Sequence, residues 1–280
     1  MDNIPIGKVI KYKPLIKYIG LQGKYPILNK DVVLGVEIEL EHIKYISDLS
    51  GNTIHLMQED SLKIDGQEFV TIPLQLKYIE IELKRLFSGV QGKETQRCST
   101  HVHMNIRDMS VNQLKTMILL YMIFERSLYR FSGDRWNNRF CIPLQHHIKT
   151  ISTLFRYLQA YTICTGYNLQ KYAGINLLPI WGKTGNSKKQ GTIEFRQMKG
   201  TTDISYILDW CSLITSLKRY AQRTELQELI TRIKEINTTS SYLWLALDVF
   251  KDKTSLITEQ PTFVEDIKTG ISYCKYVLTD

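Results

Sequence analysis

Residues 35–41, GVEIELE, alternate apolar and acidic side chains with a period of two. That period predicts a β-strand, because successive side chains of a strand point to opposite faces of the sheet. The apolar residues then face a core, and the other face carries Glu37, Glu39 and Glu41. Carboxylates spaced roughly 6 to 7 Å apart on such a face repel by roughly 2 to 3 kcal/mol per adjacent pair at an effective dielectric constant of ~20. The strand therefore needs either solvent or a cation on this face, and both alternatives stay open from this stretch alone.

Length and composition bound the class of protein. The chain has 280 residues, 43% of them apolar, which is enough for a sizeable buried core. Its longest apolar run, residues 117–124, is far shorter than the ~20 residues that a membrane span needs. The N-terminus lacks the apolar segment of a signal peptide, so we expect a cytoplasmic protein. Five cysteines without a CxxC pair indicate neither a disulfide framework nor a zinc ribbon.

The net charge of +8 predicts an anionic partner of one of three classes: nucleic acid, a nucleotide or an acidic substrate. Lysine and arginine are scattered along the chain, and no zinc finger, RNP motif or basic-region helix occurs. Nucleic acid is therefore the weaker interpretation, and no membrane partner is expected.

Two later segments repeat the period of two and place polar residues in pairs. These pairs are His101 with His103, and Glu194 with Arg196. A lone histidine is more often structural, but two on one strand face suit a metal or a phosphate about as often as a structural role.

A β-hairpin is predicted between residues 59–63 and residues 66–73. Its signal is the turn sequence Asp65-Gly66 between two short extended runs. Glu68 falls on the polar face of the second run, so another acid joins the strand carboxylates.

Helices are predicted between these strands as the scaffold. The first runs from residue 74 to residue 89, and Ser110 with Gln113 forms a capping box before a long apolar helix ending near Phe131. Helical spacing over residues 204–217 predicts another, and Thr224 heads a second capping box. A short helix is predicted near residues 242–247. A further strand is predicted over residues 171–179.

The order of these motifs resembles that of the glutamine synthetase-like carboxylate-amine ligases, and most closely the amidoligase family found in bacterial and phage genomes. The matching phrases include Gly-x-Glu-x-Glu at residues 35–39, Cys-x-x-His-Val-His at residues 98–103 and Glu-Phe-Arg at residues 194–196. They extend over residues 35–210. Phe140 stands where the family usually has tyrosine.

The resemblance implies an α+β fold: a curved antiparallel sheet with helices packed on its convex face, forming a glutamine synthetase-like catalytic domain. We expect a single domain over residues 1–280, with a motif core of about 33–222 and a helical C-terminal extension over 223–280. The implied activity is ATP-dependent amide formation through an acyl-phosphate, with Mg²⁺ or Mn²⁺ and with a carboxylate donor and an amine donor as partners.

The resemblance also implies roles for individual residues. It assigns metal binding to Glu37, Glu39, Glu68, His101 and Glu194. It assigns the nucleotide and its phosphates to His103, Lys171, Arg196, Arg135 and Arg139, and catalysis to Arg196 and Lys171. More weakly, it assigns the substrate to Asp60 and Asn176. Two alternatives stay open: an enzyme that phosphorylates without forming an amide, and a non-catalytic basic binding module on the same scaffold.

Overall fold

The computed structural model describes residues 3–9, 32–47, 53–59, 61–157, 172–181 and 190–279. The strands within these ranges are β1 (Val33–Tyr45), β2 (Ile54–Met57), β3 (Gln67–Thr71), β4 (Leu74–Gln75), β5 (Val90–Lys93), β6 (Ser99–Asn105), β7 (Ile175–Asn176) and β8 (Thr192–Lys199). They form one sheet in the order β2-β3-β1-β6-β8-β7, with β4 and β5 also paired to β1. Every strand pair in the described ranges is antiparallel.

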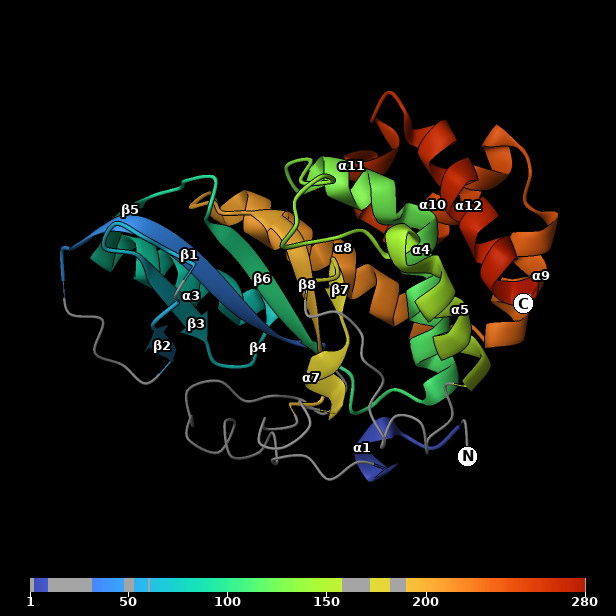
Figure 1. The fold of residues 1–280 in the computed structure, drawn as a ribbon, viewed down its shortest axis with the longest axis horizontal. Helices are drawn as coiled ribbons and strands as arrows, with labels where there is room; N and C mark the ends of the chain where they lie inside the picture. Colours follow the sequence, from blue (N-terminus) through green and yellow to red (C-terminus); the bar gives the residue numbers. More distant parts are fainter. Residues whose placement is uncertain are drawn as a thin grey trace.

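Helices cover one side of the sheet and pack at one of its ends (Figure 1). The longer ones are α3 (Leu76–Gly89), α4 (Val111–Phe131), α5 (Ile148–Tyr157), α8 (Ile204–Arg223), α9 (Leu226–Glu235), α10 (Thr239–Phe250) and α12 (Phe263–Thr279). The short ones are α1 (Ile6–Val9), η1 (Leu144–His147), α7 (Leu178–Trp181), η2 (Lys251–Lys253) and α11 (Ser255–Thr258). None of the described helices is long and apolar enough to cross a membrane.

The sheet has one core face and one polar face, as the period of two predicts. α3 packs against β1, and α8 packs against β6 and α3. On β8, Phe195 points to this side and meets the Trp210 ring of α8 at a centroid distance of 6.4 Å. Val36 and Ile38 of β1 are fully buried. The α+β class and the antiparallel sheet are therefore confirmed, while its curvature, the convex packing and the likeness to glutamine synthetase stay predictions.

α4 begins at the predicted capping box. The Ser110 side chain accepts the Gln113 N–H at 3.2 Å, and the Gln113 side chain accepts the Ser110 N–H at 2.8 Å. The helix then runs to Phe131, as predicted, and is buried because it packs against α8 on one side and α12 on another. It forms the centre of the helical part of the molecule (Figure 1).

The C-terminal region contains more structure than the single short helix predicted there. α10 is longer than predicted, and α12 lies along α4. Gly270 permits this approach, because a Cβ at that position would overlap the carbonyl oxygens of Met122 and Ile123.

Two local predictions are wrong. The first hairpin strand is β2, not residues 59–63; the described residues of that stretch form no strand, and the Lys63 N–H donates to the Glu41 carboxylate at 2.6 Å instead of to a strand partner. The second capping box does not form, since Thr224 ends α8 and Glu225 starts α9 without a side-chain cap.

The strand predicted over residues 171–179 is shorter in the part of the chain that the structure describes. Only Ile175–Asn176 pair with β8, and α7 follows. Pro179 lies in the first turn of α7, where a helix needs no N–H donor.

Candidate active site

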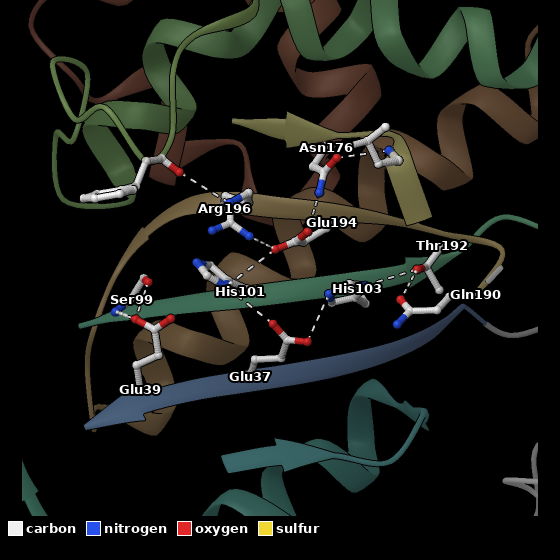
Figure 2. A network of polar contacts seen from close by, with 12 residues as sticks. Glu37, Glu39, Ser99, His101, His103, Asn176, Gln190, Thr192, Glu194 and Arg196 are labelled. Atoms are coloured by element: carbon white, nitrogen blue, oxygen red, sulfur yellow. Dashed lines mark hydrogen bonds and ion pairs between the residues drawn. The ribbon is translucent and has the colours of Figure 1, made fainter. Parts of the chain in front are cut away.

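Opposed positions on neighbouring strands bring the predicted polar residues onto one face of the sheet (Figure 2). The opposed pairs are Glu39 with Glu68, Glu37 with His101, and His103 with Glu194. Directly opposed side chains of an antiparallel pair have Cβ atoms roughly 4.5 to 5.5 Å apart, so such pairs interact. The predicted convergence of Glu37, Glu39, Glu68, His101 and Glu194 is therefore what the strand register produces.

Glu37 lies at the centre of the cluster. Its Oε1 is 3.1 Å from His103 Nε2, and its Oε2 is 3.4 Å from His101 Nδ1. Burial acts to raise the pKa of Glu37, but the charge of His103 and hydrogen bonds from both histidines hold it well below its usual range. Burial likewise acts to lower the pKa of His103, but the charge of Glu37, its hydrogen bond and the charge of Glu194 together raise that pKa to about 9.

The pKa of Glu68 reflects an excess of negative charge in the site. Burial, and then the charges of Glu37, Glu39 and Glu59, raise the pKa of Glu68 to about 8. Perturbed pKa values cluster at functional sites, where like charges are held close together. A bound cation would relieve the repulsion.

Two groups of side chains are close enough to hold a metal ion. They are Glu37 with Glu68 and His101, and Glu37 with His103 and Glu194. In each group, one ligand atom per residue lies within 4.8 Å of the others, and Glu37 belongs to both. Carboxylate oxygens with an imidazole suit Mg²⁺ or Mn²⁺. His103, predicted to contact phosphate, thus lies among metal-type ligands, and among the described residues Glu39 is in neither group.

Glu39 and Glu194 are each oriented by neighbours. Glu39 Oε2 accepts the Ser99 N–H at 2.8 Å and the Ser99 hydroxyl at 2.6 Å. Glu194 Oε1 is bound by Arg196, and its Oε2 accepts the Asn176 amide at 2.6 Å. Asn176, predicted to contact substrate, therefore contacts a candidate metal ligand (Figure 2).

Arg196 lies two residues after Glu194 on β8, so the period of two places it in the same site, next to a bulge. The register between β6 and β8 shifts between Thr100 and Val102. Such bulges redirect side chains and are common beside active sites. The Arg196 Nε donates to the Phe140 carbonyl oxygen at 3.3 Å, which fixes the guanidinium beside Glu194.

These residues line a cleft of about 710 Å³. The predicted residues in its lining are Glu37, Glu39, Glu68, His101, His103, Arg135, Arg139, Glu194 and Arg196. Asn176 lies behind Glu194 and is absent from this lining. Asp60 and Lys171, also predicted, lie outside the described residues.

Sequence reasoning did not single out several lining residues. They include Glu59, Lys63, Arg97, Ser99 and Tyr172. Ser99 belongs to the same strand as His101 and shares its face at a spacing of two, which was the available signal. Lys63 and Arg97 lie on loops, where no periodicity indicates direction.

Glu41, the third carboxylate of the strand, has a structural role. Its oxygens accept two hydrogen bonds from Arg97, both at 2.9 Å, one from the Thr95 hydroxyl at 2.8 Å, and one from the Lys63 N–H. The Arg97 hydrogen bond is the main cause that lowers the pKa of Glu41 to about 2. Glu41 thereby ties two loops of the cleft wall to β1.

A comparison with known families bears on this site. Residues 57–218 match the model of the family described as "Putative amidoligase enzyme". The chain belongs to this amidoligase family. The amidoligase match includes β3, β6 and β8 but begins after β1, so the Glu37 that both metal-type groups share lies before it. No curated protein matches the chain.

Proposed function

We propose that the protein is an ATP-dependent carboxylate-amine ligase that forms an amide bond through an acyl-phosphate. The observation that carries this proposal is the cluster of carboxylates and imidazoles around Glu37, rimmed by arginines within one cleft. Membership of the amidoligase family supports the ligase class.

The residues present fit a divalent cation. The donor set combines carboxylates with imidazoles, and the raised pKa of Glu68 reflects a surplus of negative charge that a cation would balance. Glu37, Glu68 and His101 would hold one Mg²⁺ or Mn²⁺, and Glu37, His103 and Glu194 would hold another. When bound, such ions neutralise charge on a transferring phosphoryl group.

The arginines of the cleft would act on the phosphates. Arg196 is held by Glu194 and by the Phe140 carbonyl oxygen, so its guanidinium is positioned before substrate arrives. Arg135 donates to the Met198 carbonyl oxygen at 3.0 Å, which fixes it at the cleft wall. Preorganised donors of this kind stabilise charge that develops in the transition state. Lys171 and Asp60 keep the roles that the family resemblance implies, phosphate contact and substrate contact.

The proposed reaction has two steps. An oxygen of the donor carboxylate attacks the γ-phosphorus of ATP, and the bond to ADP breaks to leave an acyl-phosphate. The amine nitrogen then attacks the acyl carbon, the carbon–oxygen bond to phosphate breaks, and the amine loses a proton. The products are the amide, ADP and phosphate. The cleft residues contribute mainly by positioning and by electrostatics.

The test is ADP release with Mg-ATP over a panel of carboxylates and amines. We expect one donor pair to stimulate release by the parent protein and Glu37→Gln to abolish that stimulation. Glu80→Gln is the matched control, because Glu80 lies on the exposed side of α3 and pairs only with Lys84 among the contacts described for it.

Two results would favour the alternatives. ADP formation with a phosphorylated product but no amide would indicate a phosphotransferase. No donor-stimulated ADP release from any pair, together with tight, salt-sensitive binding to nucleic acid, would indicate a basic binding module.

A further inference from the structure

Two exposed aromatic rings meet at the outer part of the cleft. Phe140 and Tyr172 both line it and are 40% and 39% exposed. Their ring centroids are 5.6 Å apart, and the ring planes cross at 76°. The two segments are joined by backbone hydrogen bonds, from the Ile142 N–H to the Tyr172 carbonyl and from the Gly174 N–H to the Ile142 carbonyl. The rings thus form a fixed corner, here called the aromatic corner.

Guanidinium groups flank the aromatic corner. The Arg139 Cζ lies 4.8 Å from the centroid of the Phe140 ring, and the Arg196 Cζ lies 5.9 Å from that of the Tyr172 ring. Arg196 also contacts Glu194 of the acidic cluster. One residue therefore adjoins both the aromatic corner and the candidate metal ligands.

This arrangement suits a planar ring that is attached to a polyanion. Aromatic side chains at a binding surface stack on the flat faces of bases, and guanidinium groups bind phosphate oxygens. A nucleoside triphosphate has both parts. A ligand with an aromatic ring but no phosphates would stack on the two rings of the corner. It would offer no anionic group to the guanidinium groups of Arg139 and Arg196.

We infer that the aromatic corner takes the base of the nucleotide, with the phosphates directed toward Arg196. This inference rests on the proposed function and extends it, since neither Phe140 nor Tyr172 belongs to the metal-type groups. Stacking recognises the face of a base rather than its edge, so the corner is expected to tolerate different bases.

Calorimetric titration with Mg-ATP and with Mg-tripolyphosphate separates the base from the phosphates. We expect the parent protein to bind ATP roughly 10-fold or more tightly than tripolyphosphate, in keeping with the energy of stacking on aromatic side chains. Phe140→Leu and Tyr172→Leu should each remove most of that difference while tripolyphosphate affinity changes by less than about twofold. Phe140→Tyr keeps the ring and should keep ATP affinity. Trp244→Leu is the matched control, because Trp244 is 65% exposed on α10, and it should bind both ligands as the parent does.

Four outcomes would overturn the assignment. Equal affinity of the parent for the two ligands would show that no base site exists, while the phosphate site would stand. Equal loss of both ligands in the leucine variants would show that the rings act only through loop structure. Unchanged ATP affinity with reduced donor-stimulated ADP release would assign the corner to another substrate. If the parent binds neither ligand, the proposed function itself fails, and the base assignment fails with it.

Discussion

Glu125 of α4 offers a test of how the loop that carries Arg135 and Arg139 is held in place. It is 2% exposed, and its carboxylate accepts the Leu144 N–H at 2.6 Å and the Gln145 N–H at 3.2 Å. These two N–H groups begin η1, directly after the loop that carries Arg135 and Arg139. Burial raises the pKa of Glu125 to about 7, against the opposing effect of the two backbone hydrogen bonds.

The raised pKa makes the free energy of unfolding depend on pH. Between the unfolded value of 4.5 and about 7, Glu125 is protonated in the folded state and ionised in the unfolded state. The folded state therefore binds more protons, and the free energy of unfolding falls as pH rises through this range. At about 1.36 kcal/mol per pKa unit, the fall between pH 5 and pH 8 is about 2 to 3 kcal/mol.

Urea unfolding of the parent and of Glu125→Gln at intervals from pH 5 to pH 8 measures this effect. The changed hydrogen bonds of Glu125→Gln shift its free energy of unfolding by the same amount at every pH. The informative quantity is therefore how the difference between the two free energies of unfolding varies with pH. We expect the parent to lose about 2 to 3 kcal/mol relative to Glu125→Gln across the range. Glu228→Gln, on the exposed side of α9, should run parallel to the parent. Parallel curves for Glu125→Gln as well would refute the reasoning.

Three further predictions concern the site and the C-terminal helix. Arg196→Ala should lower turnover by ~10²-fold, with a smaller loss of ATP affinity and partial rescue by lysine; equal losses in steady-state kinetics and binding would contradict this. Mg-ATP at a hundredfold excess over its Kd should stabilise the parent by ~2 to 3 kcal/mol, and thermal melts of Glu37→Gln should lack the shift. Gly270→Ala should destabilise by about 1 to 3 kcal/mol in urea unfolding, because its Cβ overlaps the backbone of α4, while exposed Lys268→Ala should change little.

The sequence by itself determined which side chains share a face. A period of two depends only on local backbone geometry, so it placed Glu37, His101 and Glu194 on polar faces before any pairing of strands was known. The capping box at Ser110 was predictable for the same reason, since both of its hydrogen bonds form within one turn. The ordered motifs also indicated the amidoligase family, which the family match confirms.

Where local signals competed with long-range contacts, sequence reasoning failed. Thr224 has the pattern of a capping residue, but its N–H completes α8 by bonding to the Tyr220 carbonyl, so α9 starts one residue later. Residues 59–63 have an extended pattern, but the Glu41 carboxylate captures the Lys63 N–H from a distant strand. Such contacts join residues far apart in the chain and leave no local period.

Only the tertiary structure decided how the polar residues divide their roles. Strand register sets Glu37 between His101 and His103, so that it belongs to both metal-type groups. Glu41 has the same sequence period as Glu37, yet it binds Arg97 and supports the cleft wall. The physical reason is that a period states which face a side chain occupies, whereas its partner depends on which strand or loop packs opposite that face.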